Sequence, residues 1–208
     1  MGRYNGPACR ICRREGMKLF LKGERCNMAK CAIETGRGVP GMHGMQRSKP
    51  SDYARQFREK QRLQRFYGLQ NGQFRLVFRR AARAQGITGE TLLQALEMRL
   101  DNLVYRLGFA ASRRAARQLV RHRHVAVNGH TADVPSMTLK VGDTIVVRDN
   151  PRSRGLAQKA LESAQGRTLS PWLTLDAAAF SGSVVRIPTR DEIAPLVNEQ
   201  LVVELCSK

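Results

Sequence analysis

Apolar residues recur at helical spacing through the middle of the chain, and this pattern predicts its first elements. A helix is expected over 52–67, where Ser51 has the position and side chain of an N-cap. A second helix is expected over 73–85, and a third over 89–107, where leucines repeat every three or four residues until Gly108. The aromatic residues of the first two helices have the spacing of core residues: Tyr53, Phe57, Phe66, Phe74 and Phe78.

The next part of the chain predicts a short helix followed by a β-hairpin. The helix runs from Ser112 to about His122, and a strand follows over His124–Asn128. Asn128-Gly129 is a strong signal for a two-residue hairpin turn, and Thr144–Val147 is expected to be a further strand. Towards the C-terminus we expect a helix over 155–165 and strands at Trp172–Leu175, Val184–Ile187 and Leu201–Leu205. The expected fold class is therefore α+β.

Residues 1–50 differ from the rest of the chain. They lack helical periodicity, contain few apolar residues, and include a loop rich in glycine and proline over 36–44. A segment of this composition is not expected to bury a core, so its folding needs a covalent or metal staple.

Four cysteines in this segment are candidate ligands for such a staple. Cys9 and Cys12 form one close pair, and Cys26 and Cys31 form another, so four thiolates can converge on one tetrahedral Zn²⁺ ion. An iron–sulfur cluster on the same four cysteines is the alternative. Disulfides are less expected in a chain that begins without a secretory signal. Nearby basic residues are expected to lower the thiol pKa values: Arg10, Arg13, Arg14, Lys22, Arg25 and Lys30.

Net charge indicates the kind of partner. The 208 residues include 36 Lys and Arg against 17 Asp and Glu, a net charge of +19, which favours a polyanionic partner. An anionic membrane fits less well than nucleic acid, because a single Trp is present and no amphipathic membrane helix is evident. With no apolar run long enough to cross a bilayer, the expected location is cytoplasmic.

The charge is also unevenly distributed along the chain. Residues 1–90 carry 20 basic and 6 acidic residues, whereas residues 171–208 carry 3 basic and 5 acidic residues. The polyanion is therefore expected against the N-terminal half, and the C-terminal segment is expected to contact protein.

Arginines repeat along one face of each predicted helix. The helix that begins at Ser112 has one basic face, formed by Arg113, Arg114, Arg117 and Arg121. Its opposite face is apolar. A row of one sign favours phosphate contact over a merely solvated surface, because arginine pairs with phosphate through two hydrogen bonds. Helix 73–85 carries a similar row at Arg75, Arg79 and Arg83. The candidate RNA-binding residues are Arg3, Arg13, Arg14, Lys49, Arg55, Arg58, Arg62, Arg65, Arg113, Arg114, Arg117, Arg121 and Arg123.

The sequence contains no recognisable catalytic motif. A phosphate-binding glycine loop, a zinc-protease HExxH motif and a serine nucleophile elbow are all missing. We therefore expect a binding protein without an active site or a small-molecule substrate.

Several motifs in order resemble the universal small-subunit ribosomal protein S-four family, in its bacterial four-cysteine form, and the resemblance spans the whole chain. These motifs are Cys9-x2-Cys12-Arg13-Arg14-Glu15-Gly16, Ser51-Asp52-Tyr53, Arg99-Leu100-Asp101-Asn102, Arg106-Leu107-Gly108-Phe109, Val127-Asn128-Gly129 and Asn198-Glu199-Gln200-Leu201-Val202-Val203-Glu204-Leu205. The loop Gly38–Gly44 departs from the family in having Met42, where a polar residue is common.

The resemblance implies an organisation into parts. A four-cysteine metal-binding segment would occupy 1–45, and a helical rRNA-binding domain 46–95 would be completed by 171–208. A small α-helix/β-hairpin RNA-binding module would be inserted over 96–170, with its core at about 97–157.

The resemblance also implies a function. A member of the family would be a structural constituent of the ribosome that binds a multi-helix junction in the 5′ part of small-subunit rRNA early in assembly. It would nucleate the body of the subunit, contribute to decoding accuracy, contact ribosomal protein S-five, and lie near the point where messenger RNA enters.

Two other classes of protein remain as alternatives. Pseudouridine synthases and some tRNA synthetases carry the same small module, but an enzyme of that kind needs a catalytic domain, and no segment is left to supply one. A zinc-dependent DNA-binding regulator would need a recognition helix, whereas the basic helix here leads into a hairpin. The RNA that co-purifies with the protein distinguishes these classes. A ribosomal protein should carry rRNA fragments, an RNA-modifying enzyme should carry tRNA, and a DNA-binding regulator should carry no RNA.

Overall fold

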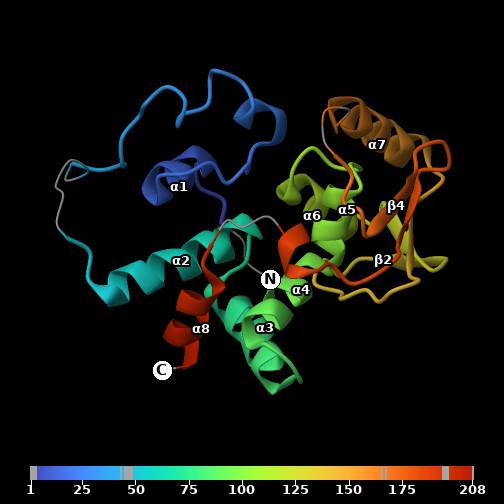
Figure 1. Ribbon diagram of the computed structural model, residues 1–208. Coiled ribbons are helices and arrows are strands. Elements are labelled where there is room, and N and C mark those ends of the chain that lie inside the picture. The colour runs from blue at the N-terminus through green and yellow to red at the C-terminus, as the bar shows by residue number, and fades with distance from the viewer. Residues whose placement is uncertain are drawn as a thin grey trace. The chain divides into compact units, whose positions relative to one another are not determined.

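The computed structural model describes residues 4–42, 44, 49–164, 166, 168–193 and 197–207. The chain divides into two compact units, one formed by residues 1–92 with 195–208 and the other by residues 93–194. Helices and an antiparallel sheet are both present, so the α+β class is confirmed (Figure 1). Among the described residues, every helix is too short or too polar to cross a bilayer.

The first unit is helical. Its elements are α1 (Ala8–Glu15), η1 (Gly23–Cys26), α2 (Asp52–Phe66), α3 (Asn71–Arg83), the start of α4 (Thr88–Glu97), and α8 (Glu199–Ser207). The Ser51 hydroxyl accepts a hydrogen bond from the backbone N–H of Ala54 at 3.3 Å, which confirms the predicted N-cap of α2. Helices α2 and α8 lie side by side although residues 67–198 separate them in the sequence (Figure 1).

Helix α8 replaces a predicted strand. The segment Leu201–Leu205 was expected to be extended, but it is helical and buries Val202 completely. The Gln56 side chain on α2 donates a hydrogen bond to the Glu204 carboxylate at 2.8 Å. Only one side of this segment is buried. A helix places the apolar residues of the segment on that side, and the strand prediction was therefore wrong.

One predicted core aromatic lies at the surface instead. Phe66, Phe74 and Phe78 are buried as expected, but the side chain of Tyr53 is 63% exposed. Its ring stacks on Phe57, with centroids 6.0 Å apart. Tyr53 is in the first turn of α2, where residues 51–53 are all exposed. Helical spacing alone therefore overestimated the length of the buried stripe.

The N-terminal segment has a small core of its own, contrary to the prediction from its composition. The core includes Ala8, Ile11, Cys12, Leu19 and Leu21, and partly buried Met17 and Ile33 pack against it. A thiol behaves here as a small apolar side chain, so residues counted as candidate ligands also contribute to packing.

The second unit combines three helices with a five-stranded antiparallel sheet. The helices are α5 (Leu100–Arg106), α6 (Arg113–Arg121) and α7 (Pro151–Ala164), and a 3₁₀ turn, η2 (Arg190–Glu192), follows the sheet. The strands are β1 (Val125–Val127), β2 (His130–Ala132), β3 (Thr144–Val147), β4 (Leu173–Asp176) and β5 (Ser181–Val184), in the order β2-β1-β3-β5-β4. Asn128 and Gly129 have φ angles of 49° and 81°, which confirms the predicted hairpin turn.

The predicted helix 89–107 is interrupted. Its leucines are buried as expected, but the chain leaves the helix at Met98 and Arg99 before α5 begins. The Leu100 N–H donates to the Met137 carbonyl at 2.8 Å, and the Leu139 N–H donates to the Met98 carbonyl at 3.0 Å. Pairing with this distant segment satisfies the backbone groups that a continuous helix would have used.

The C-terminal segment was assigned to the wrong unit over part of its length. The prediction returned the chain to the helical domain from residue 171, and the strand expected at Val184–Ile187 lies earlier, in β5. Strand β5 pairs with β3, with Thr144 opposite Ser183, and β4 pairs with β5. Residues 173–184 therefore complete the sheet of the second unit, and only residues from 195 onward belong to the first.

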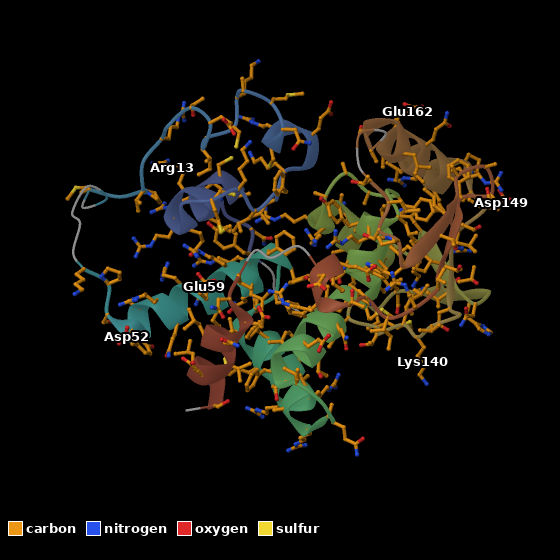
Figure 2. All side chains as sticks on the ribbon, viewed as in Figure 1. Arg13, Asp52, Glu59, Lys140, Asp149 and Glu162 are labelled. Atoms are coloured by element: carbon orange, nitrogen blue, oxygen red, sulfur yellow. The ribbon has the colours of Figure 1, made fainter. Side chains whose placement is uncertain are left out.

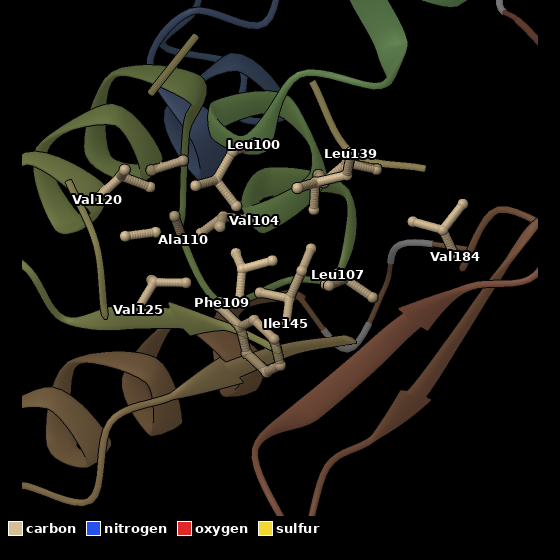
Figure 3. Packing of buried hydrophobic residues seen from close by; sticks show 14 of the residues in the cluster. Leu100, Val104, Leu107, Phe109, Ala110, Val120, Val125, Leu139, Ile145 and Val184 are labelled. Carbon is tan, nitrogen blue, oxygen red and sulfur yellow. The ribbon is translucent and has the colours of Figure 1, made fainter. Parts of the chain in front are cut away.

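The core of the second unit lies between its helices and its sheet. Side chains of α5 and α6, such as Val104 and Val120, point toward Val125 and Ile145 of the strands (Figure 3). A Cβ atom on Gly182 would come within 2.6 Å of the Leu107 side chain and 2.9 Å of the backbone oxygen of Thr174 on β4, so the close packing at this point of β5 requires glycine. This packing positions α6 with one face on the core and the other turned away from it.

Candidate nucleic-acid interface

Helix α6 carries the basic face that the sequence predicted. The Ser112 hydroxyl accepts a hydrogen bond from the Ala115 N–H at 3.3 Å, which confirms it as the N-cap. Ala116 and Val120 are completely buried. Since these two residues hold one face against the core, the arginines on the opposite side are directed toward the surface.

The arginines of this face are not equivalent. Arg121 and Arg123 are exposed, whereas Arg113, Arg114 and Arg117 are half-buried. Arg123 has an ion pair with Asp133 at 3.3 Å, and both side chains remain open to solvent. Arg121 is therefore the member of the row that is most accessible to a phosphate group.

Arg113 and Arg117 contact the start of α5. The Nε atom of Arg113 donates to the Asn102 side chain at 2.8 Å, and its guanidinium lies 4.6 Å from the centre of the Tyr105 ring. Nη1 of Arg117 lies 3.3 Å from the Asp101 carboxylate. The sequence-based prediction counted these residues as free cations, and it missed the acid and the amide because they are distant in sequence.

The arginines of α2 surround a buried carboxylate. Glu15, the last residue of α1, has a completely buried side chain. Arg58 lies 3.4 Å from its carboxylate, Arg65 contacts the same oxygen, and Arg62 donates to the Glu15 backbone carbonyl at 3.3 Å. Burial is the main reason that the pKa of Arg58 is lowered. These predicted RNA-binding residues therefore also hold α1 against α2.

Charges along the rest of α2 are partly paired. Arg62 also contacts Glu59, and Arg55 pairs with Asp52 at 3.1 Å in solvent; Figure 2 shows both acids on this helix. An exposed pair such as Arg55–Asp52 contributes little to stability, so Arg55 remains available to a phosphate group.

The remaining predicted residues lie in the N-terminal segment. Arg13 is half-buried, and its Nε donates to the Gly38 carbonyl at 2.7 Å; the residue is labelled in Figure 2. Arg14 and Lys49 are exposed. Arg3 lies outside the residues that the structure describes.

Helix α3 presents arginines that were omitted from the predicted set. Phe74, Phe78 and Ala81 are buried, and all four arginines of the helix are exposed, namely Arg75, Arg79, Arg80 and Arg83. The side chains of Arg79, Arg80 and Arg83 form neither an ion pair nor a hydrogen bond with any described residue. The row at every fourth residue was recognised in the sequence but was not carried into the candidate set. The absence of any acid between Glu59 and Glu90 was a second signal in favour of including these arginines.

The four N-terminal cysteines are free thiols. Cys9 and Cys12 lie on α1, Cys26 ends η1, and Cys31 follows five residues later; all but Cys9 are buried. The backbone N–H of Lys22 donates to Cys26 Sγ at 3.4 Å. Within the described parts of the chain, no three His, Cys, Asp or Glu side chains are arranged to hold a metal ion.

The pKa of Cys12 departs from the expectation that basic neighbours would lower it. Burial raises the pKa of this thiol, and the three other cysteines raise it further, which outweighs the hydrogen bond from the backbone at Leu19. The expected lowering is therefore wrong for Cys12, because it considered the cations in the sequence but not the apolar core around the thiol. The metal site stays a prediction.

Two family models together match residues 3–145 of the chain. Residues 3–97 match the family model described as the ribosomal protein S4/S9 N-terminal domain, and residues 98–145 match the S4 domain. Together with the basic helix and hairpin, these matches define a ribosomal protein that contains an S4 domain.

Individual relatives extend over the full length. The small ribosomal subunit proteins uS4 of Thermus thermophilus and Trichlorobacter lovleyi are each 53% identical to the chain, over 209 and 208 residues respectively. The protein of the same name from Syntrophomonas wolfei is 54% identical over 209 residues. In all three, the whole of both chains is covered. The chain belongs to the family of the small ribosomal subunit protein uS4.

Proposed function

We propose that this chain is a primary rRNA-binding protein that binds a multi-helix junction in the 5′ part of small-subunit rRNA and nucleates assembly of the subunit body. As a member of the uS4 family it is a structural, ribosome-bound component of the small subunit that binds rRNA, and it is not an enzyme.

One observation carries the proposed mode of binding. The exposed arginines of α3 and α6 lie on helices whose opposite faces are buried, so both helices present cations on rigid elements. Folded RNA offers phosphates and 2′-hydroxyls at its surface, while its deep major groove hides the base edges. Phosphate and shape readout is therefore expected to outweigh readout of bases.

A salt titration tests this mode with the full chain and a transcribed 5′-domain fragment of small-subunit rRNA. Each neutralised phosphate releases counterions, so affinity should fall steeply as salt increases. For roughly 6–10 contacts, the loss between 50 and 200 mM salt is about 10³–10⁵-fold by the rule for duplex DNA. A shallow slope would contradict phosphate readout.

Variants then identify the binding helices. Arg121→Gln on α6 and Arg79→Gln on α3 should each weaken binding and reduce the slope, because both residues are exposed. The matched control is Arg186→Gln, which removes the same charge from an arginine that is 45% exposed in the acidic C-terminal segment. If all three variants bind the rRNA fragment with the same affinity, the affinity depends only on net charge, and neither helix forms the interface.

We further propose protein and mRNA contacts for the same chain. The C-terminal segment 171–208 has 5 acidic and 3 basic residues, which favours contact with protein, and ribosomal protein S-five is the proposed neighbour. A position near the point where messenger RNA enters, and a contribution to decoding accuracy, complete the proposal. Crosslinking within the assembled subunit tests it, and crosslinks from 171–208 mainly to rRNA would contradict it.

The four N-terminal cysteines are proposed to hold one structural Zn²⁺ ion, with an iron–sulfur cluster as the alternative. Their spacing in the sequence, their free thiols and the N–H···S hydrogen bond to Cys26 support this proposal. A bound ion would add an anchor to the small core around Cys12, since structural zinc contributes folding free energy.

A further inference from the structure

Three polar side chains are buried where α4 ends and α5 begins. Glu97 is completely buried, and Asp101 and Asn102 are 5% and 2% exposed. A buried carboxylate is costly unless cations and hydrogen bonds compensate it. All three side chains bind arginines, so the structure compensates this cost with cations that come from several elements.

Asp101 joins two arginines. Arg99 binds it through two hydrogen bonds, from Nε at 3.0 Å and from Nη2 at 2.8 Å. Arg117 of α6 approaches the same carboxylate with Nη1 at 3.3 Å. Arg99 is almost fully buried, whereas the Arg117 side chain is 16% exposed, so Asp101 connects a buried cation to one that reaches the surface.

Asn102 and Glu97 hold two further arginines. The Asn102 amide donates to the Glu97 carboxylate at 2.6 Å, and its oxygen accepts from Nε of Arg113 at 2.8 Å. Glu97 also accepts two hydrogen bonds from Arg106, at 3.0 and 2.7 Å. The amide therefore has both its donor and its acceptor engaged, which fixes its orientation and that of Arg113.

The cluster has more cations than acids. It contains four arginines, Arg99, Arg106, Arg113 and Arg117, and two carboxylates, so these six side chains together carry a net positive charge that favours an anion. An exposed arginine loses side-chain freedom when it binds, whereas one already held in place loses much less. A phosphate that meets Arg113 and Arg117 therefore meets groups that are already ordered.

We infer that Asp101 and Asn102 are positioning residues for RNA binding, which hold Arg117 and Arg113 in a preformed site for an RNA backbone phosphate. The inference rests on the proposed function, because it takes rRNA as the ligand. It extends that function by giving buried residues that never contact RNA a role in affinity.

The direction in which one substitution changes RNA affinity distinguishes a positioning role from simple electrostatic repulsion. Asp101→Asn removes a negative charge beside the RNA-binding face, so electrostatic attraction alone would make RNA bind more tightly. Positioning predicts weaker binding, because the Arg117 guanidinium loses its anchor. The matched control is Glu162→Gln, which makes the same charge change at an exposed acid of α7 (Figure 2).

The experiment measures binding of the full chain to the transcribed 5′-domain fragment across a range of salt. Asp101→Asn should bind RNA about tenfold more weakly than wild type. This factor corresponds to the free energy of about one charge-assisted hydrogen bond. Glu162→Gln should bind as well as wild type or slightly better. If Asp101→Asn matches Glu162→Gln or binds more tightly than wild type, the inference is overturned.

A double-mutant cycle excludes a merely structural effect. If Asp101 acts through Arg117, then Asp101→Asn combined with Arg117→Gln should bind no more weakly than Arg117→Gln alone. If the two losses multiply, Asp101 acts independently, and the inference fails. Circular dichroism melts confirm that each variant is folded at the temperature of the assay.

A second pair of variants keeps the test decisive if Asp101→Asn does not fold. Asn102→Ser changes no charge but releases Arg113, and its loss of binding should disappear when Arg113→Gln is already present. Losses that persist in that background would overturn the inference for Asn102. A wild-type chain that fails to bind the fragment would instead contradict the proposed function itself.

Discussion

Replacing Glu15 with Gln tests whether one carboxylate holds the N-terminal segment in place. The Glu15 side chain is completely buried, with Nη1 of Arg58 at 3.4 Å and Nε of Arg62 at 4.0 Å. Arg65 contacts the carboxylate as well. Glutamine keeps the shape of the side chain and one oxygen acceptor, so Glu15→Gln removes the charge and little else. Three guanidinium groups would then face one another, and of these Arg62 also contacts Glu59.

The expected loss follows from the burial of the acid and the partial exposure of its partners. Removing one member of a buried ion pair costs roughly 3–5 kcal/mol, because the remaining charge is left uncompensated. Each of the three arginine side chains is about 30% exposed, so water compensates part of that loss. We therefore expect the free energy of unfolding to fall by about 3 kcal/mol, the lower end of the range.

Urea unfolding of the full chain measures this loss, with equal metal content in all samples. The matched control is Glu24→Gln, which removes an exposed acid from the same N-terminal segment. The control should change stability by less than about 0.5 kcal/mol, as is usual for surface substitutions. If Glu15→Gln unfolds at the same urea concentration as Glu24→Gln, the arginine cluster does not hold α1 on α2.

Three further predictions concern the metal, the core and a titrating group. Purified wild type should contain one zinc ion per chain. The Cys12→Ser variant should lose this ion, and a protease should then cleave it more readily within residues 4–42. A zinc content well below one per chain, or iron in place of zinc, would exclude a zinc site. Val120→Ala should cost about 2 kcal/mol in urea unfolding, because Val120 is completely buried, whereas Leu119→Ala should cost less because Leu119 is only partly buried. Hydrogen bonds from the Arg186 side chain and then from the Thr189 backbone lower the pKa of Glu192 from 4.5 to about 2. Its contribution to stability is therefore present above about pH 4.5 and is lost as the pH falls toward 2. NMR titration should show the Glu192 pKa rising in Arg186→Gln, and an unchanged pKa would contradict this assignment.

Local patterns predicted most of the elements that depend on neighbouring residues. Ser51 and Ser112 cap their helices as expected, and Asn128 with Gly129 forms the expected turn. Each of these features depends on hydrogen bonds or φ angles within a few residues, so the sequence contains all the information they need.

Elements that depend on distant partners were predicted less well. The break at Met98 and Arg99 depends on pairing with residues near Thr138, and the helical form of α8 depends on packing against α2. The apolar spacing within either segment does not reveal these partners. Strand β5 likewise joins the second unit because it pairs with β3, a contact that no pattern within residues 171–208 encodes.

The sequence by itself determined the class of partner, because a net charge of +19 and rows of arginine on predicted helices require only composition and helical spacing. Tertiary structure decided which arginines extend freely into solvent and which are held in place by acids. Glu15 meets Arg58 across 43 positions, and Asp101 meets Arg117 across 16. Ion pairs of this kind depend on distance in space, so a row of like charges in the sequence cannot reveal the buried carboxylates that fold against it.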